Sequence, residues 1–138
     1  MIVYSDLIGV PFAYGGRGPD TYDCYGLVME LHRRQGLIIP DYRSSSDTFL
    51  IAESMRQSIE QGVWKNKWLK QTAHDVPSSA DIADGDVLLL KIKGLPCHVG
   101  MSVGKDRFVH TWEGVGGVLT ERTSLWKQRV LGIYTFNG

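Results

Sequence analysis

The spacing of apolar residues along the chain changes from helical to strand-like. In the first half, Leu27, Val28 and Leu31 fall on one helical face, and Cys24 lies one turn before the first two. Asp23 precedes this face in the N-cap position, where a carboxylate can accept hydrogen bonds from unpaired backbone N–H groups. The pattern therefore predicts a helix that begins at Cys24.

Two further helices are predicted from the first half of the chain. Ser5–Ile8 fits one helical turn with Ser5 as its cap, and the Gly- and Pro-rich segment Pro11–Asp20 is typical of a loop. An apolar stripe between a capping aspartate and a glycine predicts a longer helix from Thr48 to about Gln61. The next segment, Trp64–Ala83, shows no clear period.

The residue pattern of the second half of the chain predicts β-strands. Five short runs of β-forming residues follow one another, separated by turn residues: Val87–Ile92, Val99–Val103, Arg107–Trp112, Val118–Thr120 and Val130–Phe136. Short links between strands make antiparallel neighbours. Helices first and strands afterwards predict an α+β fold, with the helices packed on one side of an antiparallel sheet.

Composition narrows the range of functions. With 138 residues, of which 43% are hydrophobic, the chain is expected to form a single domain, residues 1–138, with an ordinary core. Fifteen Lys and Arg residues balance fifteen Asp and Glu residues, which argues against a nucleic-acid partner. The chain contains no run of about 18 apolar residues, so no membrane-spanning helix is expected. The start, MIVYSDLIGV, lacks the features of a signal peptide.

Cys24 has the expected surroundings of a reactive thiol. Unpaired backbone N–H groups at the start of a helix carry partial positive charge, which stabilises a thiolate. A thiolate still needs a base for acyl transfer. A buried structural thiol is the alternative, because free cysteine is among the most buried residue types. Cys97 alternates with His98 along a predicted strand, so it is expected to point away from the site.

Two of the four histidines lie in predicted strands. His98 and His110 alternate with apolar residues there. A hairpin through Gly104–Asp106, centred on residue 104, pairs residue 98 with residue 110 and places the two rings side by side on one face. One ring can then act as base while the other orients it by a hydrogen bond. His32 and His74 are interpreted as surface or satisfied core residues.

Three segments form a combined pattern: GVPFAYGG, DCYGLV and HVGMSVGKDRFVH, with Gly85-Asp86 at a strand start between the last two. Together they resemble the NlpC-type cell-wall cysteine peptidases, a branch of the papain-like fold, over nearly the whole chain. The resemblance implies N-terminal helices on a five- to six-stranded antiparallel sheet. It implies Cys24 as nucleophile, His98 as general base and His110 as the residue that orients it.

The same resemblance implies a substrate and a set of contact residues. The substrate is an amide bond in peptidoglycan stem peptides, commonly between γ-D-glutamyl and a diamino acid, and no cofactor is needed. The residues expected to bind substrate or the oxyanion are Phe12, Tyr14, Asp23, Tyr25 and Trp112. Asp23 is foremost a helix cap, and Trp112 lies two residues past His110 in the same strand.

Two residues depart from the family's pattern. Phe12 stands where the family usually has a tyrosine whose hydroxyl is thought to help stabilise the oxyanion. Tyr14, Tyr25 or the backbone N–H of Cys24 are the candidates to replace it. Tyr25 itself stands where most members have serine, and this resembles members encoded in phage tail modules. That resemblance implies phage tail tip proteins as partners, and location in the virion or delivery to the periplasm and cell wall.

Three other interpretations stay open. Phe12 favours a structural tail-tip module that kept the fold and lost strong catalysis. A lipid acyltransferase of related fold would use the same catalytic residues on a different acyl substrate. A zinc site from Cys97, His98 and His110 matches no common structural zinc spacing and lacks a clear fourth ligand, so no metal is expected.

Overall fold

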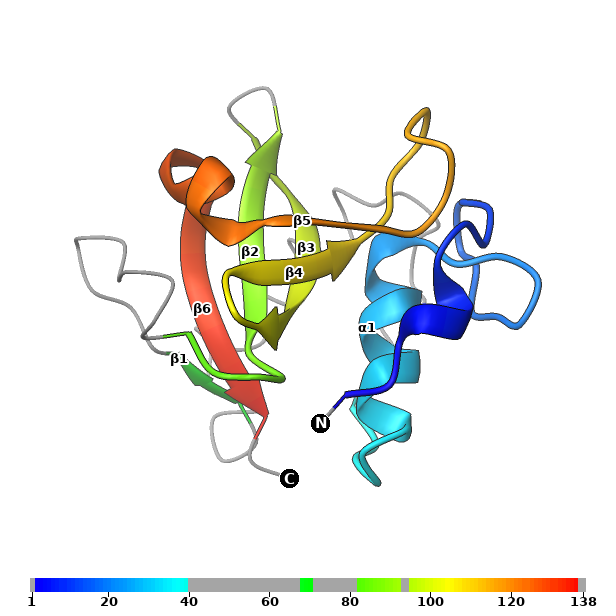
Figure 1. The fold of residues 1–138 in the computed structure, drawn as a ribbon, viewed down its shortest axis with the longest axis horizontal. Helices are drawn as coiled ribbons and strands as arrows, with labels where there is room; N and C mark the ends of the chain where they lie inside the picture. Colours follow the sequence, from blue (N-terminus) through cyan, green and yellow to red (C-terminus); the bar gives the residue numbers. More distant parts are fainter. Residues whose placement is uncertain (1, 40–67, 71–81, 93–94, 137–138) are drawn as a thin grey trace.

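The computed structural model describes residues 2–39, 68–70, 82–92 and 95–136. The predicted helix Thr48–Gln61 and His74 lie outside these residues. The described part contains one α-helix, two short 3-10 helices and one sheet, arranged with the helix beside the sheet (Figure 1). The predicted α+β, papain-like architecture is confirmed.

Six strands form a single antiparallel sheet in the order β1-β6-β2-β3-β4-β5. Their bounds are β1 Trp68–Lys70, β2 Val87–Ile92, β3 Leu95–Gly104, β4 Arg107–His110, β5 Leu119–Arg122 and β6 Val130–Phe136. Consecutive strands from β2 to β5 are neighbours, as short connections require. The last strand, β6, crosses back to pair with the other side of β2 and also carries β1.

The helix α1 spans Cys24–Arg33 and begins at the predicted residue. Asp23 is its N-cap, and Asp23 Oδ1 accepts a hydrogen bond of 2.6 Å from the backbone N–H of Gly26. The apolar face of the helix packs against β3 and β4 (Figure 1). The short helix η1 spans Ser5–Leu7, and its N-cap is Tyr4, so Ser5 as a cap was wrong: Ser5 is the first helical residue.

Alternation along the strands gives the sheet two buried faces. On the face toward α1, the strands contribute buried apolar side chains that share one cluster with the helix: Val87, Leu89, Val99, Met101 and Val109. On the other face, a second cluster includes Leu88, Leu90, Phe108 and Trp126, the last from the 3-10 helix η3, Thr123–Arg129. Within the described residues, no helix has the length and apolar character needed to cross a membrane.

The hairpin between β3 and β4 has a different register from the predicted one. Met101 pairs with Val109 and Ser102 with Phe108, and an irregularity follows before Gly104 pairs with Arg107. The turn is made by Lys105 and Asp106, whose φ angles are 51° and 61°. The centre of the hairpin is therefore shifted, and His98 and His110 lie diagonally across the strands instead of directly opposite.

Candidate active site

Cys24 occupies the first residue of α1, and its side chain is completely buried. It belongs to the core cluster on the α1 face of the sheet, together with Val99 and Val109. In the sequence, Val99 directly follows His98, and Val109 directly precedes His110. The thiol thus lies among the neighbours of the predicted histidine pair, but access by a substrate requires movement of the groups that cover it.

The loop before α1 is attached to the helix start through Asp23. Besides the cap to Gly26, the carboxylate accepts a 3.1 Å hydrogen bond from the backbone N–H of Gly15 and pairs with the Arg17 guanidinium at 2.7 Å. The backbone also approaches closely, because a Cβ added at Gly26 would overlap the carbonyl oxygen of Gly16. Glycine at position 26 therefore lets the loop lie directly against the first turn of the helix.

The structure brings the two predicted histidines together. Nε2 of His98 lies 2.8 Å from Nδ1 of His110, which is hydrogen-bond distance. Nε2 of His110 in turn lies 2.6 Å from Oε2 of Glu121 on β5. Nδ1 of His98 is buried and has no hydrogen-bond partner among the described residues. A buried nitrogen without a partner is costly, so its presence points to a role.

Burial governs the protonation of both rings. It lowers the pKa of His98 well below its usual range, and the neighbouring His110 lowers it further. Burial also lowers the pKa of His110 to about 3. An adjacent carboxylate by itself favours an imidazolium, but burial is the larger effect here. Both rings are therefore neutral near pH 7, each with one N–H and one lone pair.

The histidine rings pack beside the second apolar cluster, whereas Cys24 belongs to the first. His98 is paired with Leu90, and His110 contacts Phe108 and Trp126, all from the cluster away from α1. Among the described residues, the hydrogen bonds of the two rings are to each other and to Glu121. The hydrogen bond between the Cys24 sulfur and His98 that the predicted mechanism needs is not formed.

The start of α1 nevertheless lies near the ends of the strands that carry the histidines. Helix α1 contacts both β3 and β4, and the arrowhead of β4, which ends at His110, points toward the first turns of the helix (Figure 1). Catalytic hydrogen bonds are often long or misaligned in ligand-free structures and tighten when substrate binds. A change in side-chain position at the helix start would be needed to complete the constellation.

A cavity of about 370 Å³ is linked to the histidine pair through Trp112, which lines it and packs against both rings. Phe12 and Trp112 form part of its wall, and Glu113 and several glycines complete it. The Trp112 ring lies 5.1 Å from the ring of His98 and 4.7 Å from that of His110. The Tyr14 hydroxyl donates a 2.5 Å hydrogen bond to Glu113, and its ring meets Phe12 edge-on at 5.0 Å. Of the predicted contact residues, Trp112 thus packs against the histidines, while Phe12 and Tyr14 lie at or next to the cavity that Trp112 lines.

The other predicted residues lie elsewhere. Tyr25 is completely buried, with the guanidinium of Arg17 6.0 Å from its ring centre. His32 is buried on α1, and its Nδ1 lies 2.8 Å from the carbonyl oxygen of Val28, so it is a satisfied core residue, as predicted. The side chain of Cys97 lies outside the described part of the molecule.

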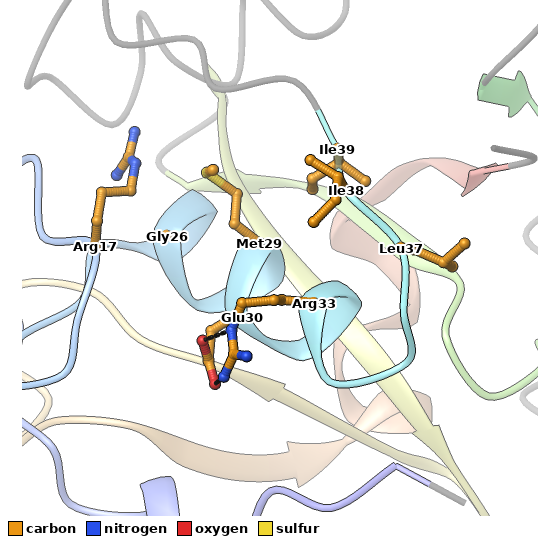
Figure 2. A pocket seen from close by; sticks show the side chains of 8 residues that line it. All are labelled: Arg17, Gly26, Met29, Glu30, Arg33, Leu37, Ile38 and Ile39. Carbon is orange, nitrogen blue, oxygen red and sulfur yellow. Dashed lines mark hydrogen bonds and ion pairs between the residues drawn. The ribbon is translucent and has the colours of Figure 1, made fainter.

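A second cavity, of about 210 Å³, runs along α1 (Figure 2). Met29 on the helix and Ile38 and Ile39 in the following segment provide most of its apolar lining, and Glu30 and Arg33 form an ion pair at its edge. None of the predicted catalytic residues lines it. It is therefore separate from the cavity beside the histidines.

Sequence reasoning missed two residues of the histidine cluster. Glu121 accepts the hydrogen bond from His110, and Trp126 packs 5.2 Å from the same ring. Glu121 comes from β5, where it pairs with Phe108 across the strands. Its position could have been found only from the register of β4 and β5, which the sequence pattern does not specify.

The helix on an antiparallel sheet, with a cysteine at the helix start and histidines on neighbouring strands, is the arrangement of the papain-like class. The chain belongs to the NlpC/P60 family, whose model matches residues 9–135. Among the described residues, no group of three His, Cys, Asp or Glu side chains is arranged to hold a metal ion.

Curated relatives are similar to this chain at low identity. One is a probable peptidoglycan endopeptidase, LytE, of Bacillus subtilis, 25% identical over 94% of this chain and 31% of the relative. Another is the murein DD-endopeptidase and murein LD-carboxypeptidase MepS of Escherichia coli, 27% identical over 91% of this chain and 55% of the relative. The chain thus spans between about a third and just over half of these relatives' length.

Solved structures of the family share the fold. NlpC1 from Trichomonas vaginalis aligns with a TM-score of 0.63 and 23% identity, covering 94% of this chain and 41% of that one. The NlpC/p60 domain of the peptidoglycan hydrolase SagA aligns with a TM-score of 0.56 and 18% identity, covering 94% and 89%. At these identities the likeness establishes the fold alone.

Proposed function

We propose that the protein is a cysteine endopeptidase that hydrolyses amide bonds in peptidoglycan stem peptides. The observation that carries the proposal is the His98–His110 pair, on two strands that contact the cysteine helix: three of its four ring nitrogens are hydrogen-bonded, and Nδ1 of His98 is buried without a partner among the described residues. Membership of the NlpC/P60 family supports it, as does the similarity to a probable peptidoglycan endopeptidase and a murein endopeptidase.

In this mechanism, the thiol of Cys24 is the nucleophile. Its proton moves to Nδ1 of His98 while sulfur bonds to the carbonyl carbon, and the carbonyl oxygen becomes an oxyanion. The C–N bond then breaks, and the leaving amine takes the proton from His98. Water attacks the resulting thioester, His98 accepts a proton from the water, and the acid product leaves as the thiol is restored. His110 holds the ring of His98 in place throughout.

The cavity beside the histidines is the proposed place for the stem peptide. It adjoins His98 through Trp112, and its glycines leave the backbone accessible to an extended peptide. The carboxylate of Glu113 on its wall suits a substrate with a free amino group, such as a diamino acid. This supports cleavage between γ-D-glutamyl and the diamino acid. Tyr25, directly after the nucleophile, supports a setting in a phage tail that acts on the cell wall.

The proposal is tested by identifying the products of the wild-type protein. Purified peptidoglycan and a lipid ester are incubated separately with the protein, and the products are analysed by mass spectrometry. We expect stem-peptide fragments with a new amino terminus on the diamino acid, and no release of fatty acid. Release of fatty acid without wall fragments would instead establish a lipid acyl substrate for the same residues.

A structural module with the same fold is the second candidate. Phe12 lacks the hydroxyl expected at its position, and Cys24 is completely buried, which favours a protein without strong catalysis. Alkylation by iodoacetamide at neutral pH separates the two. An enzyme is expected to label rapidly at Cys24 and slowly at Cys97, whereas a structural module labels slowly at Cys24.

A further inference from the structure

Three polar side chains from neighbouring strands form one hydrogen-bonded chain. It runs from His98 on β3 to His110 on β4 and on to Glu121 on β5. The two imidazole rings are almost fully buried, whereas the Glu121 side chain is 33% exposed. The chain therefore connects the buried ring with the unpartnered nitrogen to a carboxylate at the surface.

We propose that Glu121 is a positioning residue that determines which nitrogen of His98 is free to act as the base. The inference rests on the proposed function, because it concerns the residue to which the mechanism assigns proton transfer. Two successive hydrogen bonds separate Glu121 from His98, so Glu121 acts on His98 only through His110.

The direction of each hydrogen bond follows from the carboxylate. An ionised carboxylate only accepts hydrogen bonds, so Nε2 of His110 must carry the proton that points at Glu121. A neutral His110 then has its lone pair on Nδ1, and Nδ1 can only accept from Nε2–H of His98. A neutral His98 with its proton on Nε2 has its lone pair on Nδ1, which is the buried nitrogen without a partner.

Without the carboxylate, the opposite arrangement is equally good for the rings. His110 could carry its proton on Nδ1 and donate to Nε2 of His98, and the distance between the rings would be the same. His98 would then carry its proton on Nδ1 and have no lone pair to receive the thiol proton. The low pKa of both buried rings supports this reasoning, because neutral rings have tautomers to choose between.

The test combines nitrogen NMR of the histidine rings with kinetics. Glu121→Leu removes the acceptor and keeps a side chain of similar size, and Glu121→Gln keeps an oxygen that can accept the same bond. Arg122→Gln is the matched control on β5, because the Arg122 side chain is exposed and pairs only loosely with Asp106, at 3.4 Å. Ring resonances are assigned with His98→Gln and His110→Gln variants.

In the wild type we expect protons on Nε2 of both rings and lone pairs on Nδ1. In Glu121→Leu we expect a measurable fraction of both rings with the proton on Nδ1, and a fall in kcat of about tenfold or more with KM little changed. Glu121→Gln should recover part of both effects, and Arg122→Gln should change neither.

The inference is overturned if the wild-type rings carry their protons on Nδ1. It is also overturned if Glu121→Leu keeps the wild-type tautomers and its kcat stays within about twofold of the wild type. Failure of the proposed function would look different, because every protein, including the wild type, would lack activity while the tautomers could still be read from the spectra.

Discussion

A missing hydroxyl at position 12 is the residue-scale feature that most affects the expected activity. Phe12 lies in the wall of the cavity beside the histidines and meets Tyr14 edge-on. Its ring has no donor for a developing oxyanion. The hydroxyl of Tyr14 is engaged with Glu113 at 2.5 Å, so the backbone N–H of Cys24 is the donor that the mechanism relies on.

The substitution Phe12→Tyr is therefore expected to raise kcat. One added oxyanion donor contributes about 10²–10³ in turnover where its geometry is ideal, and we expect at least tenfold here. The measurement is the initial rate of stem-peptide cleavage, with Phe12→Leu as a control that changes the ring without adding a donor. A Phe12→Tyr rate equal to that of the wild type, with Tyr14→Phe much slower, would assign the donor to Tyr14 instead.

At the scale of elements, one aspartate attaches the glycine-rich loop to α1. Asp23 is completely buried, caps the helix and neutralises Arg17, whose side chain is only 10% exposed. The position of Cys24 depends on this attachment, because it is the next residue in the chain. Loss of Asp23 would remove both the cap and a buried carboxylate paired with the nearly buried guanidinium of Arg17, which is more costly than the loss of the cap alone.

Asp23→Ala is expected to lower the free energy of unfolding by about 3 kcal/mol. Asp23→Asn keeps an oxygen for the cap and should cost less. Urea denaturation measures both, and Asp6→Ala serves as the control, because Asp6 is also paired with an arginine but its side chain is 59% exposed. Equal losses for Asp23→Ala and Asp6→Ala would show that burial of the pair is unimportant.

Local signals in the sequence were sufficient for α1 and for the existence of the strands β2 to β6, but not for β1 or the 3-10 helix η3. The helix at Cys24 follows from its cap and apolar face, and the strands Val87–Ile92 and Val130–Phe136 have the predicted bounds. The hairpin register does not follow in the same way. It depends on Lys105 and Asp106 adopting positive φ angles, which residues other than glycine seldom do.

The sequence predicted the parts of the candidate site that come from one helix start or one hairpin, but not the parts that depend on long-range strand pairing. The pairing of His98 with His110 tolerated the error in register, because diagonal neighbours on one face remain within reach of long side chains. Glu121 could not be found, since its place depends on long-range pairing of β5 with β4. Complete burial of Cys24 was likewise not visible in a pattern that only places it on a helix.

At the scale of the whole molecule, three buried histidines make stability depend on pH. Burial lowers the pKa values of His32, His98 and His110 in the folded state. The unfolded chain binds protons to these rings at a pH near 6.5, where the folded protein does not. Their contribution to stability is therefore fully present above about pH 6.5 and is lost as the pH falls toward the folded-state pKa values.

The protein is expected to be less stable at pH 5 than at pH 7. With the pKa of His110 lowered to about 3, that ring alone accounts for about 2 kcal/mol of the difference. Urea denaturation at the two pH values measures it, and His110→Gln should reduce the difference by about this amount. A stability that rises from pH 7 to pH 5 would contradict the assignment of neutral, buried rings.

The central claim is that the sulfur of Cys24 attacks the substrate, and a single substitution tests it most directly. The rate of release of stem-peptide fragments from purified peptidoglycan is compared for the wild type and Cys24→Ala, with the fold of the variant checked by circular dichroism. The account predicts that Cys24→Ala loses a factor of about 10⁴ or more. Release by the folded variant within tenfold of the wild-type rate would contradict it.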